Sequence, residues 1–129
     1  MPEGTSALLA VLAWLQIKHY VFDFLLQTAY QMRHKGTYGH AGGLLHAGLH
    51  ALGTAPVFLI LPPPLGTGAA IIAVEFLVHY HTDWVKERIG RRWSLVPSQA
   101  LHWYVFGADQ LVHQLTYLGI AAVLAAVTG

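Results

Sequence analysis

The chain has 129 residues, the length of one domain, and it is 55% hydrophobic but only 10% charged, against roughly 25% charged residues in ordinary soluble proteins. Its net charge of +1 gives no basis for binding nucleic acid, and the absence of cysteine excludes disulfides, thiolate–zinc sites, iron–sulfur clusters and a cysteine nucleophile. The nine histidines lie within the apolar segments rather than in a terminal tag, which indicates polar chemistry inside an apolar protein.

Four apolar segments follow one another along the chain, separated by short connections. At about 1.5 Å per residue the first is long enough to cross a ~30 Å hydrocarbon core. Pro56 is expected to kink the second segment, and the prolines that begin at Pro62 end it. The sequence predicts an all-α integral membrane bundle, one domain over residues 1–129, with four antiparallel transmembrane helices at about 5–33, 40–61, 66–88 and 99–127.

Basic residues gather at the first and third connections and at the helix ends beside them. Six of the seven Lys and Arg residues lie there: Arg33, Lys35, Lys86, Arg88, Arg91 and Arg92. The positive-inside rule places both connections in the cytoplasm and both termini on the non-cytoplasmic side of a bacterial inner membrane. The alternative, a soluble four-helix bundle, needs a polar face on every helix, which the second and fourth segments barely have. The expected partners are membrane lipids, and not nucleic acid.

Every apolar segment carries one pair of nitrogen or oxygen donors spaced four residues apart. On an α-helix this spacing places both members of a pair on one face. Measured from the predicted cytoplasmic ends at about 1.5 Å per residue, one donor of each segment lies at the same depth, and the others lie within about one turn. The eight candidate metal ligands are His19, Asp23, His46, His50, His79, Asp83, Asp109 and His113.

Neutral imidazole with carboxylate is a ligand set for zinc, manganese or iron. Eight donors suffice for about two divalent ions, with zinc the leading assignment. An aspartate at the centre of a membrane helix costs roughly 2.5–3.5 kcal/mol, a cost that a divalent ion offsets. The amides of Gln27 and Gln110 are expected to orient the ligands. The alternative is a metal-free hydrogen-bonded network that joins the helices.

Lys18 and Glu75 are two further ionisable residues predicted near the membrane centre. Glu75 continues the helical stripe of His79 and Asp83, one turn deeper. The two residues either form a structural ion pair or act in catalysis. In the catalytic interpretation Glu75 is a general base and Lys18 contacts a substrate phosphate.

With these residues in place, the chain resembles the small bacterial and phage membrane proteins grouped as domain of unknown function 3307. The resemblance covers nearly the whole chain and implies a four-helix membrane protein without a settled activity. His81 and the triple proline depart from the pattern. The motifs that carry it are His19-x-x-x-Asp23-Phe24-x-x-Gln27 followed by Lys35, His46-x-x-x-His50, His79-x-x-x-Asp83-x-x-Lys86 and Asp109-Gln110-x-x-His113.

The chain is also similar to inner-membrane proteins classed as metal-dependent hydrolases, and through them to zinc-dependent phospholipase C and single-strand nucleases. Those helical enzymes hold a zinc cluster with His-x-x-x-Asp pairs, which His19/Asp23 and His79/Asp83 match here. Their amino-terminal tryptophan ligand has no counterpart in this chain. The likeness implies a metal cluster that activates water, by analogy with enzymes of similar ligand pattern.

The leading hypothesis for function is a metal-dependent hydrolase that acts on a phosphoester or lipid near the cytoplasmic leaflet. A di-iron oxidase or desaturase is the first alternative. A non-enzymatic subunit of a larger membrane complex, or a homo-oligomer, with histidines that ligate haem or a pigment, is the second. A metal transporter is a third, although four short helices leave little room for alternating access.

Overall fold

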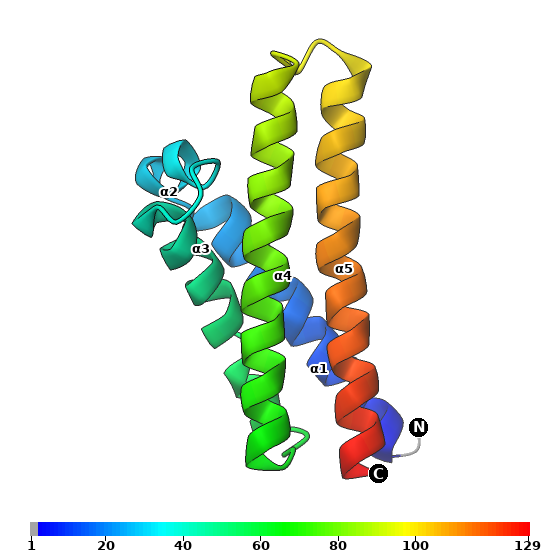
Figure 1. Ribbon diagram of the computed structural model, residues 1–129. Helices are drawn as coiled ribbons and strands as arrows, with labels where there is room; N and C mark the ends of the chain where they lie inside the picture. Colours follow the sequence, from blue (N-terminus) through cyan, green and yellow to red (C-terminus); the bar gives the residue numbers. More distant parts are fainter. Residues whose placement is uncertain (1–2) are drawn as a thin grey trace.

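The computed structural model describes residues 3–129, and in that range it contains helices and connections but no strand. This confirms the all-α prediction. Helices α4 and α5 lie side by side and antiparallel, and α1 and α3 run obliquely to them (Figure 1). The elements are α1 (Glu3–Tyr20), the π-helix η1 (Val21–Leu25), α2 (Ala29–His34), α3 (Ala41–Leu52), the 3-10 helix η2 (Ala55–Leu59), α4 (Leu65–Arg92) and α5 (Ala100–Thr128).

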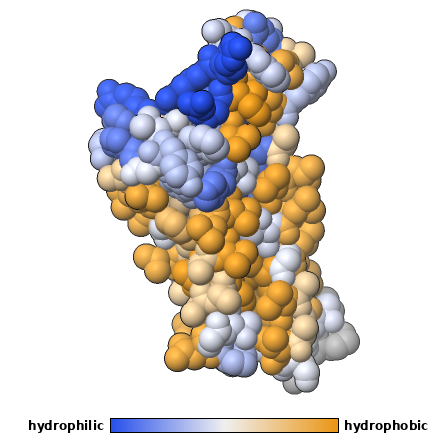
Figure 2. Space-filling view, viewed as in Figure 1, coloured by the Kyte–Doolittle hydropathy of each residue, from blue (hydrophilic) through white to orange (hydrophobic). Residues whose placement is uncertain are grey.

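The two ends of the bundle differ in polarity. The start of α1, the end of α5 and the connection into α4 lie at one end (Figure 1). Helix α2 and the connection between α4 and α5 lie toward the opposite end of the bundle. Figure 2 shows hydrophilic residues gathered at the α2 end and a largely hydrophobic surface below it. An amphipathic arrangement of this kind suits a protein that projects one polar end from an apolar medium.

The first apolar segment is not the single helix predicted over 5–33. Helix α1 ends at Tyr20 and continues as the π-helix η1, in which the Leu26 N–H donates to the carbonyl of Val21 at 2.8 Å. A capping box then starts α2: the Thr28 hydroxyl accepts from the Gln31 N–H, and the Gln31 side chain accepts from the Thr28 N–H. This reciprocal cap satisfies backbone donors locally, so the chain begins a new helix there.

The second segment also departs from the predicted helix over 40–61. Helix α3 ends at Leu52, and a short 3-10 helix follows with Pro56 in its first turn. Proline has no N–H, and its ring would clash with the carbonyl four residues earlier, here that of Leu52. Pro56 was predicted to kink this helix, but in the structure it lies just after the helix has ended. Twelve residues of α3 span about 18 Å, less than a ~30 Å hydrocarbon core.

The interior of the described bundle holds as many polar as apolar side chains. The apolar core cluster contains Leu15, Val57 and Leu124 and draws on α1, η2, α4 and α5. Large apolar side chains face outward instead, for example Ile17 at 58% and Leu118 at 53% exposed. A water-soluble domain shows the opposite pattern, with its charged side chains outside. The buried polar residues are Lys18, His19, Gln31, Lys35, His46, His50, Thr54, Glu75, His79, Asp83, Asp109 and His113.

Two stretches of the described chain are long and apolar enough to cross a membrane, Gly4–Leu25 and Ala100–Thr128. Helix α4 is nearly as long as α5 but carries several charged residues, and α3 is short. By length and composition the described chain therefore has two candidate membrane spans, which is fewer than the four predicted from sequence.

Candidate metal centre

Four buried histidines from three helices form the middle of the site. His46 and His50 come from α3, His79 from α4 and His113 from α5, and none is more than 2% exposed. The ring of His79 stacks between two others, with centroids 3.9 Å from His50 and 4.1 Å from His113. The spacing of four residues within α3 turns both of its imidazoles toward α4, as the helical period requires.

Aspartate oxygens lie among the imidazole nitrogens. Asp23 Oδ1 is 3.1 Å from His46 Nε2 and 3.0 Å from His50 Nε2. Asp83 Oδ2 is 3.2 Å from His46 Nε2 and 3.6 Å from His79 Nε2. None of these nitrogens makes a hydrogen bond to the described chain, although the contacts are short. The nitrogens and carboxylate oxygens converge without the alignment that a hydrogen bond needs.

Asp23 reaches the cluster from the π-helix rather than from a regular α-helix. A π-turn adds one residue to the helical turn, and such turns are frequent at functional sites because they re-aim a side chain. Here the Asp23 side chain is 7% exposed, and its carboxylate meets the imidazoles of α3. The local widening of the first helix thus places a carboxylate opposite histidines from another helix.

The convergence fits bound metal ions. Two ligands each about 2.0–2.1 Å from a tetrahedral ion are about 3.4 Å apart, close to the separations seen here. Buried donors that lack a partner are rare in folded proteins and call for an explanation. The buried side-chain atoms at the site that have no hydrogen-bond partner among residues 3–129 are Asp23 Oδ1, Gln27 Oε1, His46 Nε2, His50 Nδ1 and Nε2, His79 Nε2, both Asp83 carboxylate oxygens, Asp109 Oδ1 and His113 Nε2.

The donors divide into two groups, and within each group the ligand atoms all lie within 4.8 Å of one another. One group is Asp23, His46, His50 and His79, and the other is His79, Asp83 and His113. Three imidazoles with a carboxylate, or two with a carboxylate, suit zinc, manganese or iron. His79 belongs to both groups, so the two candidate ion positions are adjacent.

His19 and Asp109 complete the predicted set of eight but lie outside these groups. His19 Nδ1 shares a hydrogen bond of 2.9 Å with the Tyr117 hydroxyl, and His19 Nε2 one of 2.9 Å with Gln110 Oε1. His19 Nε2 is also 3.3 Å from Asp23 Oδ2. Asp109 Oδ1 is 3.5 Å from His113 Nε2. The structure thus brings all eight candidates together, with His19 hydrogen-bonded through both nitrogens at the edge.

The two glutamines predicted to orient ligands lie beside them. The Gln110 amide donates to Asp23 Oδ2 at 3.3 Å and to Asp109 Oδ2 at 3.1 Å, so it links α5 to η1. The Gln27 amide donates to the backbone carbonyl of Asp23. Gln110 therefore contacts carboxylates directly, whereas Gln27 braces the chain around one of them.

Lys18 and Glu75 contact each other in the interior of the bundle. Lys18 Nζ forms an ion pair with Glu75 Oε1 and donates to the carbonyl of His50 at 2.6 Å. The Thr54 hydroxyl donates to the other oxygen of Glu75. Both carboxylate oxygens are thus engaged, and neither residue belongs to a metal-capable group of the described chain. This geometry favours the ion-pair interpretation over the catalytic one.

The sequence profile of a family described as proteins of unknown function, DUF3307, matches residues 11–128. The chain belongs to the DUF3307 family. The match contains every element of the metal centre, from His19 in α1 to His113 in α5. No curated protein and no solved structure is significantly similar to the chain.

Three residues that this DUF3307 chain places at the centre were not assigned to it from sequence. Lys35 and Lys86 each lie within 3.7 Å of Asp83 carboxylate oxygens. A methyl group on Gly43 would lie 3.2 Å from the Lys35 backbone, so this glycine allows α3 to hold Lys35 close. Tyr117 continues the stripe of Asp109 and His113 by four residues, a spacing that could have identified it.

Proposed function

We propose that the chain is a multi-pass inner-membrane protein with two divalent metal ions, and that it hydrolyses a phosphoester or lipid reached from the cytoplasmic leaflet. The observation that carries this proposal is the set of buried imidazole nitrogens and aspartate oxygens that lie at ligand spacing and have no hydrogen-bond partner in the described chain. A hydrogen-bonded network that only joined helices would pair these atoms with one another.

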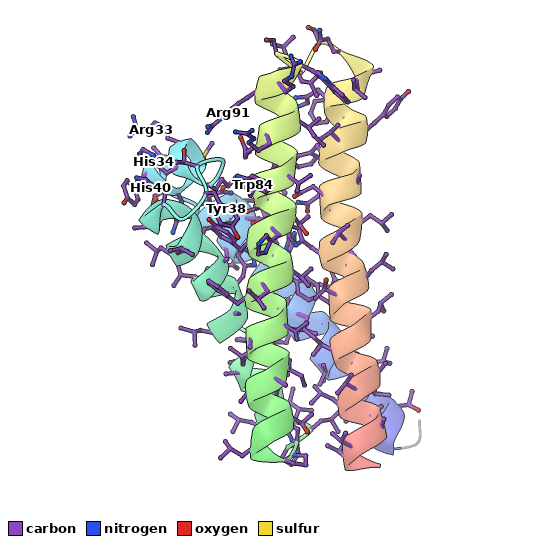
Figure 3. The ribbon with its side chains drawn as sticks, in the orientation of Figure 1. Arg33, His34, Tyr38, His40, Trp84 and Arg91 are labelled. Carbon is purple, nitrogen blue, oxygen red and sulfur yellow. The ribbon has the colours of Figure 1, made fainter. Side chains whose placement is uncertain are left out.

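Membrane insertion is supported by the exposed apolar side chains and by the two candidate spans. We place α3 with η2, and α4, in the membrane as well, because the metal centre that they share with α1 and α5 would otherwise lie outside it. In Figure 3, Arg33, His34 and His40 lie on the α2 side and Arg91 of α4 faces them. Partial desolvation and the neighbouring His40, Arg33 and Arg91 lower the pKa of His34.

The aromatic pair Tyr38 and Trp84 lies next to this basic end (Figure 3), with ring centroids 5.1 Å apart. Aromatic rings concentrate at membrane–water interfaces, and cationic residues on the cytoplasmic side of them. Both features support a cytoplasmic location for the α2 end and a non-cytoplasmic location for both termini.

The donor set suits the metal-assisted hydrolysis of an ester. Bound divalent ions supply Lewis acidity, which activates water and stabilises charge on the attacking and leaving oxygens of an ester. The residues of the chain hold the donors in place: Gln110 fixes two carboxylates, and Tyr117 fixes His19. The Lys18–Glu75 pair neutralises charge beside the centre without joining it.

The test is hydrolysis of a chromogenic phosphomonoester by zinc-loaded protein in detergent micelles. Asp83 carries two of the unpartnered carboxylate oxygens, so Asp83→Asn should lower turnover by about 10²-fold or more, as expected when metal-ion catalysis is lost. Arg92→Gln is the control, because Arg92 is a charged residue of α4 that lies outside both metal-capable groups. Turnover by the Asp83→Asn protein equal to that of the wild type would contradict the proposal.

A further inference from the structure

A cavity of about 510 Å³ lies beside the metal centre, between the α2 region, α4 and α5 at the basic end of the bundle. Three cationic side chains line it: Lys35, Lys86 and Arg91. One acidic residue, Glu87, also lines it, with Oε1 3.7 Å from Lys86 Nζ. The charged residues of the cavity wall are therefore mostly cationic.

The two lysines join the cavity to the ligand carboxylates. Lys35 Nζ is 3.5 Å from Asp83 Oδ2, and Lys86 Nζ is 3.7 Å from Asp83 Oδ1 and 3.5 Å from Asp109 Oδ2. If these carboxylates bound metal ions, less of their negative charge would remain to pair with the two lysines. Each ammonium group carries three donors, and those not used by the aspartates are free to bind an anion.

The charge of the loaded centre also requires an anion. Three aspartates and two lysines lie at the site, and two divalent ions would bring its net charge to about +3 with the histidines neutral. Burial of so much uncompensated charge is costly. A phosphomonoester group carries about −1.5 to −2 at pH 7 and offers three acceptor oxygens. The negative charge of this group would offset that of the metal ions and lysines, and its oxygens would accept hydrogen bonds from the lysines.

A second hollow, lined mainly by apolar side chains, lies along the outside of the bundle. This hollow of about 360 Å³ lies between α4 and α5, and Lys86 and Val105 line both it and the cavity. Its other walls include Val85, Ala108 and Val112, and Asp109 lies at its side. Lys86 therefore faces both a cationic cavity and an apolar groove, an arrangement that suits an amphiphile with an anionic head.

We propose that the substrate is an anionic lipid whose headgroup ends in a phosphomonoester, with the phosphate against Lys35 and Lys86 and the acyl chain in the α4–α5 groove. This inference rests on the proposed hydrolase function. In the reaction the phosphorus–oxygen bond to the lipid breaks and the oxygen of water bonds to phosphorus. One proton of the water passes to the leaving oxygen, which gives a lipid alcohol and inorganic phosphate.

The first arm of the test measures the phosphate site by calorimetry on zinc-loaded protein in a neutral detergent, with inorganic phosphate as the probe. Lys35→Gln and Lys86→Gln should each weaken binding by about 10-fold or more, because each removes a charged donor. Arg92→Gln is the control, since Arg92 is basic and on α4 but does not line the cavity. Equal affinity in all four proteins overturns the inference.

Metal content, measured on the same samples, separates this inference from the proposed function. Variants that keep their zinc but bind phosphate as the wild type does refute the phosphate site and leave the metal centre intact. Lys86→Gln could lose zinc because the Lys86 side chain contacts Asp83 and Asp109. In that case the phosphate site is tested with Lys35→Gln and Arg91→Gln. Loss of phosphate affinity in these two proteins supports the site, and unchanged affinity overturns it.

The second arm tests the lipid groove with phosphatidic acid and phosphatidylcholine of equal short chain length. The wild type should bind phosphatidic acid more tightly by about 10-fold or more. Ala108→Trp fills the groove and should abolish this binding while it spares inorganic phosphate. Ala122→Trp, at another exposed alanine of α5 outside the groove, should change neither. Phosphatidic acid binding unaffected by Ala108→Trp, or equal binding of both lipids, overturns the assignment to a lipid and leaves free phosphate as the ligand.

Discussion

The imidazole rings of His50 and His79 are stacked with centroids 3.9 Å apart, although one residue comes from α3 and the other from α4. In both rings Nε2 has no hydrogen-bond partner in the described chain. Two imidazoles that present nitrogens without hydrogen-bond partners to the same small volume are arranged as ligands. The stacking thus links the packing of α3 on α4 to the chemistry of the centre.

Because His79 belongs to both metal-capable groups, its removal should affect both ions. We expect His79→Ala to lose most of the bound metal and His113→Ala to keep about one ion of two. His102→Ala, which removes a histidine outside both groups, should keep both. Elemental analysis of folded protein, with folding checked by circular dichroism, measures the difference. Equal metal content in His79→Ala and His102→Ala would exclude a shared ligand.

Gln110 should matter for metal affinity although it is not a ligand. Its amide donates to the carboxylates of Asp23 and Asp109 and holds them in place. Removal of a group that orients a ligand typically weakens metal binding by about 10–100-fold, and we expect this range for Gln110→Ala in competition with a chelator. Gln114→Ala is the matched control on the same helix. A Gln110→Ala protein with wild-type zinc affinity would show that the hydrogen bonds are incidental.

The Lys18–Glu75 pair is predicted to stabilise the fold rather than to take part in turnover. Glu75→Gln leaves a buried ammonium group unpaired, and loss of one partner of a buried pair costs about 3–5 kcal/mol. The melting temperature should therefore fall while bound metal is retained. The double variant Lys18→Met with Glu75→Leu should recover most of the loss, because neither charge is then buried alone. Unchanged stability and metal content with lost turnover would instead identify Glu75 as a general base.

The orientation in the membrane can be tested without background because the chain contains no cysteine. Single cysteines at Thr37 and Ser98 should react with a membrane-impermeant thiol reagent only after the cytoplasmic face is opened. Cysteines at Ser6 and Gly66 should react in intact spheroplasts. All four positions are exposed in the structure. Labelling of Thr37→Cys in intact spheroplasts would reverse the proposed orientation.

Much of the candidate site was predictable from sequence because it depends on a local rule. The pairs His46/His50 and Asp109/His113 lie on regular α-helices, where a spacing of four residues determines the shared face. Alternate helices run in opposite directions, so equal depth could be estimated by counting from their ends. The structure brings these two pairs close together.

The breaks in the helices were not predictable in the same way. The π-turn at Asp23 depends on one shifted hydrogen bond, which apolar residues such as Val21 and Leu25 do not encode in their periodicity. The end of α3 before Pro56 was anticipated only as a kink, because proline is compatible with either. Lys35 and Lys86 were interpreted as topological signals at the helix ends, and only their contacts with Asp83 show them at the centre.

The central claim is that the buried histidines and aspartates hold metal, and elemental analysis of protein purified without metal-affinity chromatography tests it most directly. We predict about two divalent ions per chain, and a melting temperature that falls when a strong chelator removes them. Metal-free protein that is stably folded, and whose melting temperature a chelator leaves unchanged, would contradict the claim and identify the cluster as a polar network between helices.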